Sequence, residues 1–132
     1  MSFGDAVRTC FSKYADGKGR AGRPEYWWFF LSYIIVYIVA LIIGGAIKAS
    51  WLVFIALLVY IVPLIAAAVR RLHDTGRSGW WYLISLIPLV GTIILIVFLA
   101  SEGNPGPNEY GPPPGMAALP GTGAPPPPPP PA

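Results

Sequence analysis

The sequence predicts an all-α membrane protein: a three-transmembrane-helix bundle with an amphipathic N-terminal helix and a disordered Pro/Gly-rich C-terminal tail. Of its 132 residues, 55% are hydrophobic and only 11% are charged, whereas about 25% are charged in a typical soluble domain. Three runs of 22, 21 and 24 residues, at 26–47, 49–69 and 78–101, contain no Asp, Glu, Lys or Arg. Because about 20 apolar residues cross the hydrocarbon core as a helix, each run is long enough for one span.

Residues 1–26 are expected to form a cytoplasmic arm that contains the amphipathic helix. Ser2 is a typical N-cap with Asp5 three residues on, and Gly17 is a typical stop signal. Apolar side chains recur at helical spacing on one face, at Phe3, Ala6, Val7, Cys10, Phe11 and Tyr14. Such a helix either lies in the membrane interface or packs beneath the bundle, and the sequence alone does not separate these two placements.

The transmembrane domain is predicted to occupy residues 27–102. Its three helices are expected at about 27–44, 50–69 and 80–100. The turn between the first two is short and contains Gly44, Gly45 and Lys48, so these two helices should form an antiparallel hairpin. Within the third run, Pro88 and Gly91 mark the place where a re-entrant break would occur.

Lys and Arg residues are distributed unevenly along this topology. Five lie in the arm (Arg8, Lys13, Lys18, Arg20, Arg23) and three in the loop before the third helix (Arg70, Arg71, Arg77), against Lys48 alone in the first turn. Positive residues accumulate on the cytoplasmic side. With three spans, the N-terminus should therefore be cytoplasmic and the C-terminal tail outside. Aromatic anchors at the inner interface are then Trp27, Trp28, Trp80 and Trp81.

Residues 103–132 differ sharply in composition from the rest of the chain. They hold 13 of the 16 prolines and six of the 15 glycines, and such a segment cannot bury enough apolar surface to fold. We therefore expect a disordered tail that ends in a polyproline II rod at 125–131. The rod is either a ligand for a proline-reading domain or a solvated spacer.

Three polar clusters carry a family resemblance. The first reads Gly19-Arg20-Ala21-Gly22-Arg23-Pro24-Glu25-Tyr26-Trp27, the second runs from Arg70-Arg71-Leu72-His73-Asp74 to Trp80-Trp81, and the third runs from Gly103 to Gly111. These clusters resemble motifs of the YhaH/YhaI-type bacterial inner-membrane proteins, known as domain of unknown function 805. The resemblance covers about residues 1–113 and implies a small multi-pass protein of the inner (plasma) membrane. It implies no activity.

The arginines of these clusters, here called the arginine belt, are Arg20, Arg23, Arg70, Arg71 and Arg77. Two hypotheses explain them beyond fixing the orientation. In the first, they form a structural ion-pair network with Glu25, His73 and Asp74, since a carboxylate at a membrane boundary is costly unless it is paired. In the second, they bind the phosphate of an anionic lipid head group, which the arginine fork matches bidentately.

Enzymatic and transport functions have weaker support in the sequence. One histidine and one cysteine cannot complete a metal site of three or four ligands, and neither a nucleophile elbow nor a phosphate-binding loop occurs. An enzyme would have to rely on His73 and Asp74. A transporter or channel subunit would have to work as an oligomer, because three helices with no ionisable residue inside the spans make a poor pore.

The sequence therefore predicts a non-enzymatic structural or adaptor protein whose arginine belt engages anionic lipid head groups or a partner protein. We expect no catalytic residue, no metal and no cofactor. The expected partners are the lipid bilayer, including anionic phospholipid, and either further copies of the chain (a homo-oligomer) or another membrane protein. No nucleic-acid partner is expected.

Overall fold

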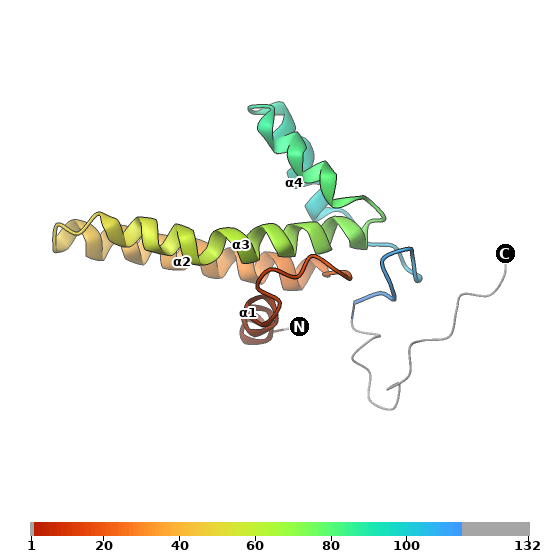
Figure 1. The fold of residues 1–132 in the computed structure, drawn as a ribbon, viewed down its shortest axis with the longest axis horizontal. Helices are drawn as coiled ribbons and strands as arrows, with labels where there is room; N and C mark the ends of the chain where they lie inside the picture. The colour runs from red at the N-terminus through yellow and green to blue at the C-terminus, as the bar shows by residue number, and fades with distance from the viewer. Residues whose placement is uncertain (1, 115–132) are drawn as a thin grey trace. The chain divides into compact units, whose positions relative to one another are not determined.

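The computed structural model describes residues 2–114, and the polyproline run predicted at 125–131 lies outside them. Its helices, in chain order, are α1 (Phe3–Ser12), α2 (Arg23–Ala46), α3 (Trp51–Asp74), the 3-10 helix η1 (Gly79–Leu86) and α4 (Val90–Ala100) (Figure 1). Residues 2–114 contain no β-strand, only an isolated bridge between Asn108 and Gly111. The fold is therefore all-α, as predicted.

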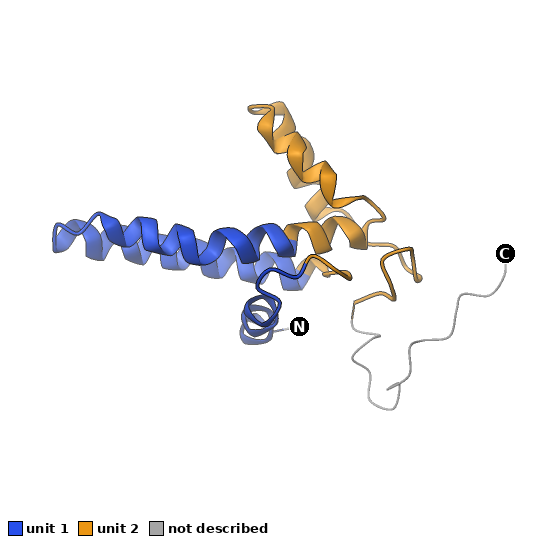
Figure 2. Ribbon diagram, viewed as in Figure 1, with its two compact units in different colours: residues 1–16, 24–67 blue, residues 17–23, 68–132 orange. Residues whose placement is uncertain are grey.

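The chain divides into two compact units. Residues 1–16 and 24–67 form the first unit, and residues 17–23 together with those from 68 onward form the second (Figure 2). The division falls within α3, whose final turns belong to the second unit.

In the first unit, α1 begins at the predicted N-cap, where the Ser2 hydroxyl accepts a hydrogen bond from the Asp5 amide at 3.2 Å. The middle of its apolar face is covered, since Ala6 and Cys10 are fully buried, whereas Phe3 and Tyr14 at the ends of that face are exposed. The Phe11 ring meets Phe29 edge-on at 5.1 Å. The helix α1 therefore packs against the first unit's other helices, and its position in the membrane interface stays a prediction.

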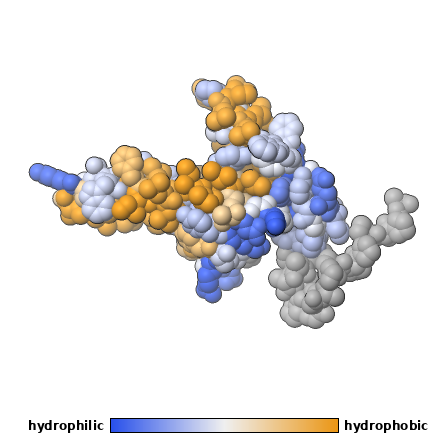
Figure 3. All heavy atoms as spheres, viewed as in Figure 1, coloured by the Kyte–Doolittle hydropathy of each residue, from blue (hydrophilic) through white to orange (hydrophobic). Residues whose placement is uncertain are grey.

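The helices α2 and α3 are long and apolar enough to cross a membrane. Each has 24 residues, or about 36 Å at about 1.5 Å per residue. They run antiparallel through a turn at 47–50, where the Ala49 amide donates to the Gly44 carbonyl at 2.7 Å. Large apolar side chains such as Ile42, Phe54 and Leu58 remain exposed on them, and Figure 3 shows this surface as hydrophobic.

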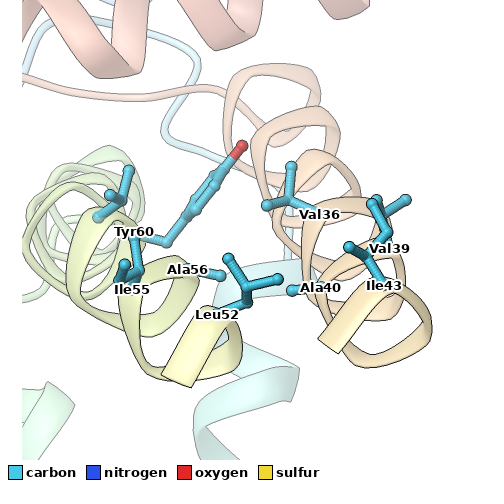
Figure 4. A pocket seen from close by; sticks show the side chains of 9 residues that line it. Val36, Val39, Ala40, Ile43, Leu52, Ile55, Ala56 and Tyr60 are labelled. Atoms are coloured by element: carbon cyan, nitrogen blue, oxygen red, sulfur yellow. The ribbon is translucent and has the colours of Figure 1, made fainter. Parts of the chain in front are cut away.

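An open apolar groove of about 330 Å³ lies between α2 and α3 (Figure 4). Aliphatic side chains and one tyrosine line it, among them Val36, Val39, Ala40, Leu52, Ala56 and Tyr60. The small side chains of Ala40 and Ala56 leave this space open where larger residues would fill it.

The third apolar run differs from its prediction. It is not one helix over 80–100: η1 has eight residues and α4 has eleven, and they are separated at 87–89. Pro88 lacks an amide hydrogen and restricts the residue before it to extended backbone, and Ile87 is indeed extended (φ −83°, ψ 112°). The prediction of one continuous third helix is therefore corrected: the structure has two helices of spanning length and one interrupted apolar segment.

The interruption is a tight reversal. Leu89 has a positive φ of 65° and ψ of −71°, and the Val90 amide donates to the Pro88 carbonyl at 2.7 Å, which is the geometry of a γ-turn. The chain then returns alongside itself, because the Trp81 ring meets Phe98 edge-on at 5.7 Å. Together η1 and α4 form a helical hairpin, here called the η1–α4 hairpin.

The close contact inside this hairpin depends on Gly91, because a Cβ atom there would overlap the backbone carbonyl of Ile84. We predict that Gly91→Ala lowers stability by about 1–3 kcal/mol, the usual cost of overpacking. The measurement is the thermal unfolding midpoint of the purified protein in detergent. Gly45→Ala is the matched control, because a Cβ atom at Gly45 meets nothing within 4 Å. Equal midpoints for the two variants would contradict the close contact.

Candidate functional site

The polar residues of the second unit gather at the C-terminal end of α3 around Asp74. One carboxylate oxygen, Oδ1, accepts from Nε of Arg20 at 2.9 Å, and the other, Oδ2, accepts from Nη1 of Arg71 at 2.7 Å. All three side chains are buried. A single buried carboxylate thus bridges an arginine of the arm and an arginine of α3.

Arg20 is saturated by partners within the protein. Beyond its bond to the Asp74 carboxylate, it donates to the Asp74 carbonyl, to the Asn104 carbonyl at 2.7 Å and to the carbonyls of Gly106 and Gly111. A guanidinium has five N–H donors, and these are five hydrogen bonds. Arg20 therefore has no donor left for an external phosphate.

Arg71 connects the same carboxylate to the end of α4. Its Nε donates to the Leu99 carbonyl at 2.8 Å and its Nη2 donates to the Ser101 carbonyl. The last carbonyls of a helix lack partners inside that helix, so Arg71 caps α4 from outside. The Arg71 side chain is fully buried, and its hydrogen bonds stabilise the fold.

Residues after α4 fit closely against this cluster. A Cβ atom at Gly103 would overlap the Asp74 carboxylate, and one at Gly76 would lie 2.8 Å from Oδ1 of Asn104. The Asn104 amide also donates to the Asp74 carbonyl at 2.7 Å. Gly103 and Asn104, which the sequence assigned to the tail, therefore make defined contacts with this cluster.

His73 lies at the side of the cluster. Its Nδ1 is 3.0 Å from the Gly19 carbonyl, and its ring stacks flat on Tyr110 at 3.9 Å. The Asn108 side chain donates to the His73 carbonyl at 2.9 Å. Burial and the neighbouring Glu109 carboxylate raise the pKa of Tyr110 above its ordinary value, so the stacked phenol stays neutral at physiological pH.

The other members of the arginine belt are placed differently. Arg70 is fully buried, and its carbonyl accepts from the Ala21 amide at 3.0 Å. Arg23 is exposed at the start of α2. Arg77 is half-buried, with its guanidinium 4.0 Å above the centre of the Phe98 ring. Only Arg23 and Arg77 of the five therefore have accessible side chains.

The remaining predicted site residues are Glu25 and the four tryptophans. Glu25 is buried in the first turn of α2. Trp27 is half-buried, and the other three predicted interface anchors, Trp28, Trp80 and Trp81, are exposed. Exposed indole rings fit the role of interfacial anchors, which stays a prediction.

Sequence reasoning missed the contribution of the segment after α4. Asn104, Asn108 and Tyr110 contact the cluster through side chain or backbone, although they were not predicted as site residues. The available signal was their position in the third polar cluster. The receiving carbonyl groups have no such signal, because every residue type carries one.

The chemical repertoire of the cluster is narrow. Within residues 2–114, no three His, Cys, Asp or Glu side chains are grouped as a metal site requires. An open hollow of about 390 Å³ lies beside the cluster and is lined by Val69, His73, Ser78, Gly79 and Trp80. His73 is its one titratable lining residue. The geometry is that of a clamp joining three chain segments.

Comparison with known proteins identifies the family of this chain. Residues 14–112 match the family model described as "Protein of unknown function (DUF805)". The chain is 42% identical over 110 residues to inner membrane protein YhaI of Escherichia coli (strain K12), covering 80% of this chain and 92% of that protein. It is 41% identical over 110 residues to inner membrane protein YhaH of the same strain, covering 76% and 88%. No solved structure matches the chain.

Two apolar helices of spanning length, together with these relatives, define a small helical protein of the inner membrane. The chain belongs to the DUF805 family, as the three polar clusters indicated.

The cluster around Asp74 predicts a specific loss of stability. Asp74→Asn leaves Arg20 and Arg71 buried and close together without a carboxylate, and removing one partner of a buried ion pair costs about 3–5 kcal/mol. We expect a lower thermal unfolding midpoint in detergent and less folded protein in the membrane. The control is Glu102→Gln, which removes an exposed carboxylate. If both variants unfold at the wild-type temperature, the clamp does not hold the second unit together.

Proposed function

We propose that this protein is a non-enzymatic structural or adaptor protein of the inner membrane whose accessible arginines, the exposed Arg23 and the half-buried Arg77, engage anionic lipid head groups. The observation that supports this proposal concerns Arg20. All five of its N–H donors have partners within the chain, so it has none left for a lipid phosphate. Arg70 and Arg71 are fully buried. The arginine belt thus consists of a buried structural part and an accessible part.

The proposed orientation has the N-terminus in the cytoplasm. Eight of the nine Lys and Arg residues lie in the arm and in the region from Arg70 to Arg77, and the ninth, Lys48, lies in the turn between α2 and α3. This bias is typical of the cytoplasmic side. The accessible arginines would then face the leaflet with the more negative surface potential.

A catalytic or transport function has less support. The His73 ring is engaged by the Gly19 carbonyl and by Tyr110, which supports an ordering role for it. The groove between α2 and α3 is lined by aliphatic side chains and Tyr60, so it suits an acyl chain better than a polar solute. Solute flux into liposomes containing the protein would favour the transporter alternative.

Lipid binding provides the direct test. A positive charge near an anionic leaflet contributes about 1 kcal/mol, so Arg23→Gln with Arg77→Gln should weaken binding to phosphatidylglycerol by about 30-fold. The measurement is titration of the purified protein with that lipid in detergent, followed by native mass spectrometry. Lys48→Gln is the control.

The proposal fails if the double variant binds phosphatidylglycerol as the wild-type protein does. It also fails if Arg71→Gln removes lipid binding while the thermal unfolding midpoint stays unchanged. In that case the buried arginines, and not the accessible ones, would be the lipid site.

A further inference from the structure

We propose that the η1–α4 hairpin is re-entrant: it inserts into the acyl chains of a single leaflet, and the chain after Ala100 emerges on the same side of the membrane as residues 17–23. The hairpin would provide a surface that contacts acyl chains and would determine the side on which the chain leaves the membrane, which goes beyond the proposed head-group binding. This topology also replaces the expectation that the tail lies on the opposite side from the arm.

The two ends of the hairpin are attached at one place. Gly79, at the start of η1, is so close to Val69 of α3 that a Cβ atom would lie 2.7 Å from that side chain. At the other end, Arg71 of α3 donates to the carbonyls of Leu99 and Ser101. The chain therefore leaves the end of α3 and returns to it. A helix that crossed the membrane could not bring Ser101 back to Arg71.

The limbs have the length of half a bilayer. Eight residues of 3-10 helix rise about 16 Å at about 2.0 Å each. Eleven residues of α-helix rise about 16 Å at about 1.5 Å each. The hydrocarbon core is about 30 Å thick, so the reversal at Pro88 and Leu89 would lie near its centre.

The far end of the hairpin is apolar and uncovered. Leu86 is 76% exposed and Leu89 is 75% exposed, and Ile87 and Val90 between and beside them are exposed as well. Figure 3 shows this end as hydrophobic, apart from the paler residues at the turn. Exposed apolar patches of this kind mark contact with a membrane or a protein. Acyl chains are the occupant that matches both the depth and the composition.

The backbone amides on both sides of Pro88 and Leu89 are hydrogen-bonded at the reversal. Unbonded backbone groups are costly in lipid, but the Ile87 amide donates to the Ile84 carbonyl at 3.0 Å and the Val90 amide to the Pro88 carbonyl. Pro88 has no amide hydrogen to satisfy. The charged residues that flank the hairpin, Arg77 and Glu102, stand at its base.

The side of the membrane that the tail occupies can be read with single cysteines. In a Cys10→Ala background, we would introduce cysteine at Glu109, at Arg23 or at Lys48, and add a membrane-impermeant maleimide to intact spheroplasts and to inverted vesicles. We expect Glu109→Cys to label from the same side as Arg23→Cys and from the opposite side to Lys48→Cys. This comparison does not depend on which side is cytoplasmic or on whether the arginines bind lipid.

Labelling of Glu109→Cys from the Lys48 side would overturn the proposal, because the third segment would then cross. If the cysteine variants fail to fold, a fluorescent reporter and a periplasm-active phosphatase fused after Ala132 of the unchanged chain read the same topology. With the N-terminus shown to be cytoplasmic by the equivalent fusions, the proposal requires fluorescence and no phosphatase activity.

The depth of the reversal is a separate measurement. A bimane probe at Leu89→Cys should be quenched by lipids brominated near the end of the acyl chain as strongly as a probe at Ile61→Cys, which lies exposed in the middle of α3. A probe at Glu102→Cys should be quenched only by lipids labelled near the head group. An unquenched Leu89 probe would show that protein, such as a second copy of the chain, covers the hairpin, and would overturn the lipid contact.

Discussion

The second unit depends on one buried carboxylate. Asp74 pairs with both Arg20 and Arg71, and because two arginines share one carboxylate, their remaining N–H donors need other acceptors. In a buried site those acceptors must come from the protein, since an unpaired polar group there is costly. Backbone carbonyls of residues 99–111 supply them. The requirement to satisfy two buried arginines therefore draws the chain after α4 back to the end of α3.

The two prolines of the apolar segments show how this return shapes the third segment. Pro63 lies inside α3, which continues through it for a further eleven residues, whereas Pro88 ends a helix. Proline is tolerated in both settings in a membrane, so the residue alone does not determine the outcome. At Pro88, the return of α4 along η1 is stabilised by the close packing at Gly91 and by the hydrogen bond with which Arg71 caps α4.

Much of this architecture is readable from the sequence where the signal is local. The two long helices were predicted at 27–44 and 50–69 and occur at Arg23–Ala46 and Trp51–Asp74, and the capped amphipathic helix was predicted with its N-cap. The end of α3 was missed because its charges suggested a loop, although in the fold they turn inward. The uninterrupted third helix was wrong for a related reason: hydropathy measures length and apolarity, and it does not report which carbonyl groups a distant arginine will bind.

The count of positive residues cannot determine on which side of the membrane the C-terminal tail lies. Residues after Ala100 contain no Lys or Arg, so the bias of eight against one is the same whether the third segment crosses or returns. The evidence for a return of the chain comes instead from hydrogen bonds between Arg20 of the arm and backbone carbonyls after α4. The residues that carry these carbonyls, Asn104, Gly106 and Gly111, lie more than 80 residues further along the chain. The three polar clusters that mark the family are therefore the three parts of one clamp. Because Arg20, Arg71 and Asp74 bind one another and backbone carbonyls of the same chain, the first role of this clamp is to hold the second unit together.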